Sequence, residues 1–198
     1  MAGSRPLVIV IAGPNDAGKS TTAPSLLRDT LQVSEFVNAD TIAGGLSAFR
    51  PDSVAIAAGR AMLERMQQLA KARVDFAFET TLASRSFAPW LAGLKRNGYH
   101  VHVLFLWLES AELAVNRVAA RVRLGGHDVP EETVHRRYTR GLRNFFDLYL
   151  PLADSWHVFD NSRAGRPQLV ASAHRDGSEQ VADAALWQRI TEAYRGQP

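Results

Sequence analysis

The chain has 198 residues, of which 46% are hydrophobic and 22% are charged, a balance typical of one soluble globular domain with a sizeable core. It has no cysteine, which excludes disulfides, thiolate metal sites and cysteine nucleophiles, and no apolar run approaches the roughly 18 residues that a membrane-spanning helix needs. The net charge is +3 with an isoelectric point near 9.6, so the chain is only mildly basic. We therefore expect a single cytoplasmic domain over residues 1–198, with no membrane contact.

Residues 1–6 are expected to form a short loose tail, and a nucleotide-binding pattern follows directly. Residues 7–11 are an unbroken apolar run rich in β-branched side chains, which predicts a buried strand of a parallel sheet. Residues 13–20 read G-P-N-D-A-G-K-S and match the P-loop pattern G-x-x-x-x-G-K-[S/T], with a strand before it and a helix after it. This context predicts a site for a nucleoside triphosphate.

Each part of this loop has a physical role in holding phosphates. Gly13 and Gly18 let the backbone turn its N–H groups inward, and the N-terminus of the next helix adds a partial positive charge. Lys19 can reach the β- and γ-phosphates, and the Ser20 hydroxyl can ligate Mg²⁺. The phosphate-binding residues expected from the pattern are Gly13, Pro14, Asn15, Asp16, Ala17, Gly18, Lys19, Ser20 and Thr21.

Predicted helices and strands alternate along the rest of the chain. Helices are expected at residues 19–31, 53–72 with Ser53 as N-cap, 86–97 closed by Gly98, 110–124 with Ser110 as N-cap, 131–149 and 183–194. Strands are expected at residues 35–38, 75–78, 100–108, 158–160 and 169–174, and Gly44 and Gly45 are expected in a loop. The alternation predicts an α/β P-loop NTPase fold, with a parallel five- to six-stranded sheet covered by helices on both faces.

Polar side chains follow the second and third of these strands, at the sheet edge where the P-loop also lies. Asp40 is the candidate base, because phosphoryl transfer to an alcohol needs a carboxylate that orients the hydroxyl and accepts its proton. Glu79, Thr80 and Thr81 suit binding of a polyhydroxylated acceptor, and Arg85 could line the same cleft. Alternatives stay open: Asp40 could cap the following helical turn or ligate magnesium, and Glu79 could be a buried partner of an arginine.

An excess of arginine surrounds the glycine-containing break at residues 125–130 and predicts a helical, Arg-rich lid at about residues 121–137. Seven arginines lie between residues 117 and 143, beside three acidic residues. A guanidinium fork suits the spread charge of a transferring γ-phosphate. By helical spacing, the candidates for binding that phosphate are Arg121, Arg123 and Arg137. The arginines expected on a solvated face are Arg136, Arg140 and Arg143.

With these motifs in place, the chain resembles the zeta-toxin-like P-loop kinases, relatives of small-molecule kinases such as chloramphenicol phosphotransferase. The matching stretches are GPNDAGKST (13–21), FVNADTIA (36–43), FAFETTLASR (76–85), RVAARVRLGGHDVPEETVHRRY (117–138) and LPLADSWHVFDNS (150–162). The resemblance implies ATP and Mg²⁺ as cosubstrate and cofactor, and Asp40 as the carboxylate that activates an acceptor hydroxyl. It also implies Glu79 and Thr81 as acceptor-binding groups, with lid arginines on the γ-phosphate.

The toxin branch of this family phosphorylates the amino sugar of UDP-N-acetylglucosamine and is silenced by an antitoxin. The resemblance therefore also implies a UDP-amino sugar as acceptor and an antitoxin as partner. Asp16 departs from the family, which often has glycine at this position. Because a carboxylate pointing inward would repel phosphate, we expect Asp16 to point to solvent.

Two other functions stay open on the residues alone. A P-loop ATPase or switch module would bind nucleotide without an acceptor, but Leu108-Glu109 stands where such proteins carry an apolar run followed by a magnesium-binding aspartate. Nucleic-acid binding by the arginine-rich surface is a weaker alternative, because no aromatic residues alternate with basic ones to form a base-stacking platform.

His100 and His102 share a strand face without a third metal ligand in view, so no metal site is expected there.

Overall fold

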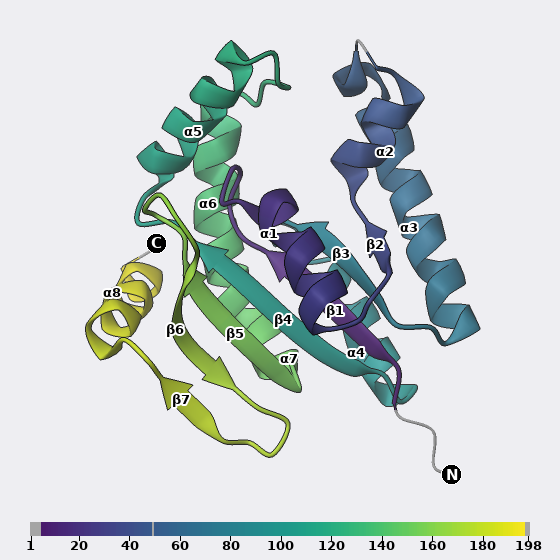
Figure 1. The fold of residues 1–198 in the computed structure, drawn as a ribbon, viewed down its shortest axis with the longest axis vertical. Helices are drawn as coiled ribbons and strands as arrows, with labels where there is room; N and C mark the ends of the chain where they lie inside the picture. Colours follow the sequence, from purple (N-terminus) through teal and green to yellow (C-terminus); the bar gives the residue numbers. More distant parts are fainter. Residues whose placement is uncertain (1–4, 49, 197–198) are drawn as a thin grey trace.

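The computed structural model describes residues 5–48 and 50–196, and it contains an α/β sheet of seven strands in the order β2-β3-β1-β4-β5-β6-β7 (Figure 1). The strands are β1 (Leu7–Ala12), β2 (Glu35–Val37), β3 (Phe76–Thr80), β4 (His100–Trp107), β5 (Ser155–Asp160), β6 (Gln168–Ala173) and β7 (Glu179–Val181). The five strands from β2 to β5 in this order are parallel, whereas β6 and β7 run antiparallel to their neighbours. The prediction of an α/β sheet is confirmed, and the expectations of five to six strands and of uniform parallel pairing are wrong.

The P-loop follows β1, which lies inside the sheet between β3 and β4. β1 pairs with β3 on one side and with β4 on the other, and every residue of β4 is buried. Because both faces of these strands are covered, β1 is a continuous apolar run, and β4 is one from Val103 to Trp107, after the buried His100 and His102 at its start. The loop that leaves β1 therefore starts from a buried strand in the interior of the sheet.

Helices cover both faces of the sheet. They are α1 (Lys19–Ser25), α2 (Ala39–Leu46), α3 (Ala55–Ala72), α4 (Phe87–Arg96), α5 (Ala111–Arg123), α6 (Glu131–Asn144), α7 (Leu150–Leu152) and α8 (Ala184–Arg195). Apolar residues of α3, α4, α6 and α8 share one core with the sheet, while α1 packs on the other face against Ile9, Ile11 and Leu104. The pairs α2–α3 and α5–α6 rise on either side of the loop that precedes α1 (Figure 1).

Several predicted boundaries differ from the structure. The first helix ends at Ser25 and continues as a π-helical turn, Leu26–Thr30, and α6 likewise ends at Asn144 before a π-helical turn, Phe145–Tyr149. Gly44 and Gly45 belong to α2 and not to a loop.

Other local predictions are mixed. Ser53 does not cap α3; its hydroxyl donates to Arg50 O over 2.7 Å inside a 3-10 turn, Pro51–Val54. Ser110 does cap α5, because its Oγ accepts from Leu113 N over 3.1 Å. Gly98 has the left-handed backbone expected after α4, with φ of 86°.

The predicted loose tail is only partly described, because residues 1–4 lie outside the described residues. Within the described part the prediction is wrong for Pro6, which is buried and accepts a hydrogen bond from His100 N over 2.8 Å.

No helix in the described part of the chain is long and apolar enough to cross a bilayer.

A histidine cluster lies near the start of β4 and β5. His102 is buried; its Nδ1 lies 2.6 Å from Ser155 Oγ, and its Nε2 lies 3.3 Å from His157 Nδ1. Burial, followed by the neighbouring His157 and His100, lowers the pKa of His102 to about 3. These imidazoles line a cavity of about 530 Å³ that shares no residue with the cavity at the P-loop.

Candidate active site

The turn between β1 and α1 has the backbone geometry that a phosphate-binding loop requires. Gly13 has φ of 143° and lies so close to Leu106 O that a Cβ atom would collide with it. Gly18 has φ of 82°, and a Cβ there would lie 2.5 Å from Asn161 Nδ2. Both positions therefore need glycine, which agrees with the sequence pattern.

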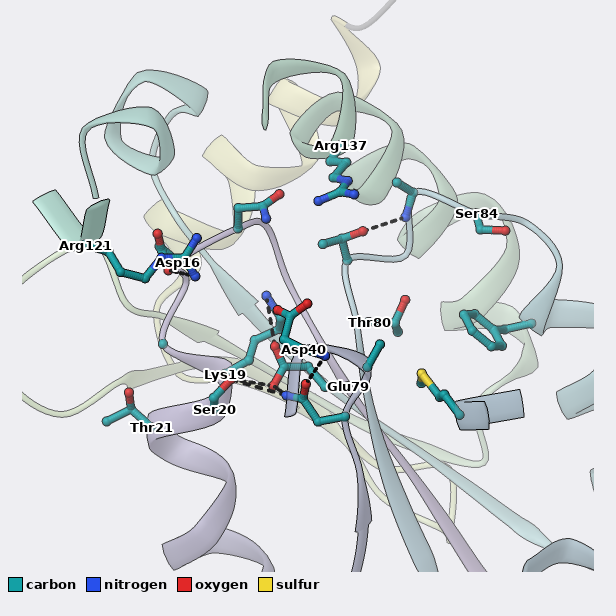
Figure 2. A pocket seen from close by; sticks show the side chains of 18 residues that line it. Asp16, Lys19, Ser20, Thr21, Asp40, Glu79, Thr80, Ser84, Arg121 and Arg137 are labelled. Carbon is teal, nitrogen blue, oxygen red and sulfur yellow. Dashed lines mark hydrogen bonds and ion pairs between the residues drawn. The ribbon is translucent and has the colours of Figure 1, made fainter. Parts of the chain in front are cut away.

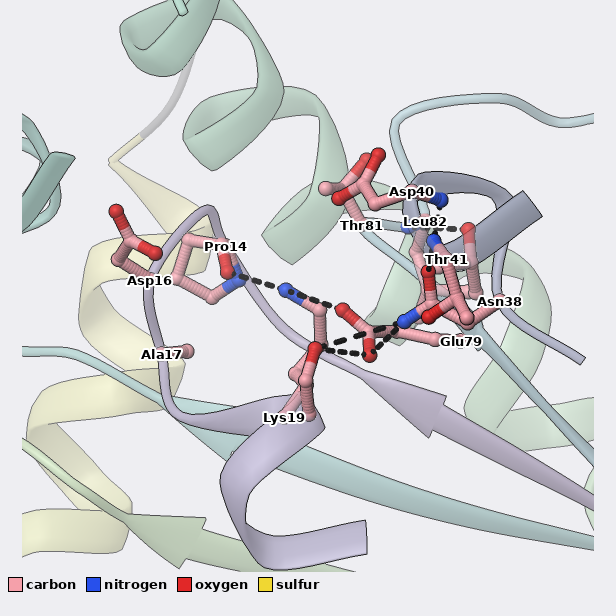
Figure 3. Close-up of polar contacts among 12 residues, drawn as sticks. Pro14, Asp16, Ala17, Lys19, Asn38, Asp40, Thr41, Glu79, Thr81 and Leu82 are labelled. Atoms are coloured by element: carbon pink, nitrogen blue, oxygen red, sulfur yellow. Dashed lines mark hydrogen bonds and ion pairs between the residues drawn. The ribbon is translucent and has the colours of Figure 1, made fainter. Parts of the chain in front are cut away.

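Lys19 is 6% exposed, and its ammonium group is already held in place (Figure 3). Nζ donates to Pro14 O over 2.7 Å and lies 3.7 Å from Glu79 Oε1. Burial lowers the pKa of Lys19, and the negative charges of Glu79, Asp16 and Asp40 oppose that shift. The lysine is thus a desolvated cation in the P-loop, and phosphate oxygens would compete with Glu79 for its N–H donors.

Glu79 joins three elements of the site through its Oε2 atom. Ser20 Oγ donates to this oxygen over 2.7 Å, and Asn38 Nδ2 donates to it over 2.7 Å. The carboxylate therefore faces the P-loop and its serine. The predicted contact of Glu79 with an acceptor stays a prediction. The sequence left open an arginine as the ion-pair partner of Glu79, but in the structure that partner is Lys19.

Asn38, which sequence reasoning did not select, is the N-cap of α2. Its Oδ1 accepts from Asp40 N over 2.8 Å and from Thr41 N over 3.1 Å. The alternative in which Asp40 caps this helix is therefore wrong, and the Asp40 side chain is left exposed beside the P-loop.

These groups line one cavity of about 540 Å³ (Figure 2). Of the predicted site residues, the lining includes Asn15, Asp16, Gly18, Lys19, Ser20, Thr21, Asp40, Glu79, Thr80, Thr81, Arg121 and Arg137. Further lining residues are Asn38, Ala39, Met62, Ala83, Ser84 and Phe87. The carboxyl ends of β1, β2 and β3 therefore meet at one site, as predicted.

Two of the three predicted lid arginines reach this cavity, from opposite sides. Arg121 enters from α5 beside the P-loop, and Arg137 enters from α6 above Asp40 and Thr80 (Figure 2). Burial lowers the pKa of Arg137, and the charge of Asp40 opposes this shift. Arg123 is exposed and does not line the cavity, so the structure does not bring it to the site; the same is true of Arg85.

The expectation that Asp16 points to solvent is wrong. Its Oδ1 lies 3.2 Å from Arg121 NH1, and the side chain is only 18% exposed. The carboxylate lines the cavity and neutralises an arginine that was predicted to bind phosphate.

Two residues behind the P-loop also escaped the sequence analysis of the site. Asn161 Nδ2 donates to Ala17 O over 2.8 Å, and Arg117 NH2 donates to Asn161 O over 2.8 Å. Arg117 belongs to the arginine-rich segment and lies on α5, and Asn161 follows the carboxyl end of β5. These positions could have identified both residues from the sequence.

The oxygen atoms that could ligate a metal at this site suit Mg²⁺. Ser20 Oγ, Glu79 and Asp40 present hydroxyl and carboxylate oxygens, which are the ligands that magnesium prefers. Within residues 5–48 and 50–196 no three His, Asp or Glu side chains are grouped to hold a metal alone. A magnesium ion here would thus depend on phosphate oxygens for the rest of its coordination, as is usual for this ion.

Comparisons with known proteins show which family the chain resembles in sequence and which solved structures share its fold. The family model described as Zeta toxin matches residues 50–164, a segment that does not include the P-loop or Asp40. An uncharacterized protein of Haemophilus influenzae is 32% identical over 130 residues, which cover 66% of this chain and 91% of that protein.

Two solved structures illustrate the fold that this chain shares with known proteins. The AvrRxo1-ORF1:AvrRxo1-ORF2 structure with ATP has a TM-score of 0.71 at 17% identity, over 96% of this chain and 64% of that one. The PezAT toxin–antitoxin system of Streptococcus pneumoniae has a TM-score of 0.64 at 15% identity, over all of this chain and 82% of that one. This chain therefore spans less than two thirds of the AvrRxo1 chain that it matches.

Proposed function

Because this chain belongs to the zeta toxin family, we propose that it is an ATP-dependent kinase that transfers the γ-phosphate of ATP to a hydroxyl of a small molecule. The observation that carries the proposal is the presence of Lys19 and Asp40 in one cavity. The first residue is a desolvated cation in a glycine loop, and the second is an accessible carboxylate next to it. A phosphate donor and a proton acceptor are the two parts that this reaction requires.

In the proposed reaction the P-loop amides and Lys19 hold the β- and γ-phosphates, and Arg121 and Arg137 approach the γ-phosphate from two sides. Asp40 accepts the proton of the acceptor hydroxyl as its oxygen forms a bond to the γ-phosphorus. The bond between that phosphorus and the β–γ bridging oxygen breaks, and ADP leaves. Positioning and charge stabilisation supply most of the catalysis in reactions of this kind.

Magnesium would be held by Ser20 Oγ, with Glu79 fixing that hydroxyl through its 2.7 Å hydrogen bond. Its chemistry would be to neutralise charge on the phosphate oxygens. Residues 1–198 would act as one domain in which residues 121–137 serve as the lid.

The acceptor half of the cavity combines hydroxyl groups with an apolar wall. Thr80, Thr81 and Ser84 offer hydroxyls, and Met62 and Phe87 offer apolar surface. This combination suits a sugar or another polyhydroxylated compound. We propose a UDP-amino sugar as the first acceptor to test, and an antitoxin as a partner, in line with the family.

The first experiment measures binding of ATP with Mg²⁺ to the wild type and to Lys19→Ala by calorimetry. Lys19→Ala should lose binding, whereas the matched control Lys71→Ala, an exposed lysine of α3, should keep it. Equal binding by wild type and Lys19→Ala would contradict the proposal.

The second experiment screens hydroxylated metabolites, including UDP-sugars, for ATP-dependent phosphorylation. Asp40→Asn should keep ATP binding and lose transfer to whichever acceptor the screen finds. Transfer at the wild-type rate by Asp40→Asn would remove Asp40 from the role of base. ATP hydrolysis stimulated by a protein, with no phosphorylated small molecule, would favour a switch module.

A further inference from the structure

Two arginines of α5, one helical turn apart, both contact the same P-loop residue. Arg117 NH1 donates to Asp16 O over 3.3 Å, and Arg121 NH1 lies 3.2 Å from Asp16 Oδ1. The first contact fixes the backbone of the loop, and the second pairs the carboxylate with a lid arginine. α5, whose C-terminal end begins the lid, and the P-loop are therefore joined at Asp16.

Arg121 is also held from its other side, by the turn that follows α5. Its NH2 donates to His127 O over 2.9 Å, and Gly126 packs so closely that a Cβ there would lie 2.5 Å from Arg121 Cγ. The guanidinium is thus kept at the P-loop side of the cavity, where Figure 2 shows it next to Asp16.

The ion pair leaves polar atoms unpaired. Among the described residues, Asp16 Oδ2 and Arg121 Nε are both buried without a hydrogen-bond partner. In a two-pronged ion pair, both carboxylate oxygens accept hydrogen bonds from two guanidinium nitrogens. Here only one oxygen, Asp16 Oδ1, contacts one nitrogen, Arg121 NH1. The Asp16–Arg121 pair is therefore a single-point contact, weaker than a two-pronged ion pair, and a phosphate oxygen could replace the carboxylate oxygen in it.

We propose that Asp16 is a built-in competitor of the γ-phosphate for Arg121, so that the free protein holds this arginine neutralised and ATP has to displace the carboxylate. The inference rests on the proposed function and concerns regulation of the same site. A carboxylate oxygen and a phosphate oxygen are alike in charge and in hydrogen-bonding geometry. Asp16 Oδ1 therefore takes the position beside Arg121 that a phosphate oxygen would occupy. Asp16 acts through Arg121 and is a positioning residue, not a catalytic one.

The test compares binding of a non-hydrolysable ATP analogue and of ADP, both with Mg²⁺, to the wild type and to Asp16→Asn. Asparagine tolerates the left-handed backbone at this position, where φ is 53°, and it keeps the shape of the side chain without the charge. We expect Asp16→Asn to bind the ATP analogue roughly tenfold more tightly, the size expected for one charge-assisted contact. ADP, which lacks the γ-phosphate, should change by less than about twofold.

The same titrations in an Arg121→Gln variant separate two explanations: competition of Asp16 for Arg121, and simple repulsion of phosphate by Asp16. In Arg121→Gln there is no guanidinium to release, so adding Asp16→Asn should give little further gain in affinity for the ATP analogue. Asp16→Ser gives an independent check in the wild-type background and should also tighten binding of the analogue.

Equal gains for the analogue and ADP, a gain that persists in Arg121→Gln, or weaker binding by Asp16→Asn would each overturn the inference while the kinase proposal stands. Failure of the wild type to bind either nucleotide would overturn the kinase proposal and this inference together. The two failures are therefore distinguishable in one set of titrations.

Discussion

Asn38 Nδ2 donates to Glu79 Oε2 over 2.7 Å, and this hydrogen bond ties the start of α2 to the end of β3. Asn38 is 6% exposed and at the same time caps α2 through its Oδ1 atom. One side chain therefore sets both the helix that presents Asp40 and the carboxylate that orders Ser20. The proposed base and the proposed magnesium ligand are positioned by the same residue.

Replacement of Asn38 should reduce both stability and transfer. Asn38→Ala removes the N-cap and a hydrogen bond to a largely buried carboxylate, so the free energy of unfolding should fall by about 1–3 kcal/mol. The rate of phosphoryl transfer should fall further than ATP affinity, because Asp40 loses its support. Urea unfolding and single-turnover kinetics measure the two effects, with the exposed neighbour Thr41→Ala as control. A variant as stable and as active as the wild type would contradict this role.

Arg137 should matter far more than the adjacent Arg136. Arg137 lines the cavity, whereas Arg136 is exposed and donates to Thr133 Oγ1 over 3.2 Å on the outer face of α6. Losing a donor aimed at charge that develops in the transition state costs on the order of 100-fold in rate. We expect Arg137→Gln to lower kcat by this order and Arg136→Gln to leave it within about twofold. Similar rates for the two variants would show that Arg137 does not contact the transferred group.

Gly141 should be indispensable for packing of α6 against the loop after β3. In α6 it lies so close to Thr81 O that a Cβ atom would collide with the backbone of the loop after β3. Gly141→Ala should therefore destabilise the protein by about 1–3 kcal/mol through overpacking. The control is Gly59→Ala in α3, where a Cβ meets nothing within 4 Å and alanine should stabilise the helix by about 0.5–1 kcal/mol. Thermal unfolding should move in opposite directions for the two variants, and a shared direction would contradict this account.

The histidine cluster should make stability depend on pH. In the folded protein the pKa of His102 is about 3, below its ordinary value of 6.5, so the unfolded chain binds more protons between these two values. The contribution of His102 is therefore complete above pH 6.5 and is lost as the pH falls toward 3. We expect a loss of about 1 kcal/mol between pH 6.5 and 5.5 from this group.

Urea unfolding at several pH values checks this dependence. His102→Gln should flatten the curve below pH 6.5, whereas the control His135→Gln, on the partly exposed surface of α6, should keep the wild-type slope. Equal slopes for His102→Gln and the wild type would contradict the assignment.

The sequence predicted the meeting of the P-loop, Asp40 and Glu79, because parallel strands end at one edge of a sheet whatever the details of their packing. It did not predict the direction of β6, although a signal was present. Residues 161–167 separate β5 from β6, and a parallel connection needs about a dozen residues or more. Only an antiparallel return fits this short connection.

Other features could not be read from neighbouring residues. In the segment Asn38-Ala39-Asp40 either polar side chain could cap a helix, and the choice depends on Glu79, which is distant in the chain. The orientation of Asp16 similarly depends on Arg121, which α5 brings across the cavity. Contacts between residues so far apart in sequence have no local pattern.

The buried lysine of the P-loop has a thermodynamic consequence. Lys19 is already desolvated and bonded to Pro14 O, and the glycines around it already have their special backbone angles. A nucleotide that arrives at this loop therefore meets a folded receptor, and little conformational entropy remains to be lost on association. We expect the heat capacity change of nucleotide binding to be small, without the large negative value of coupled folding.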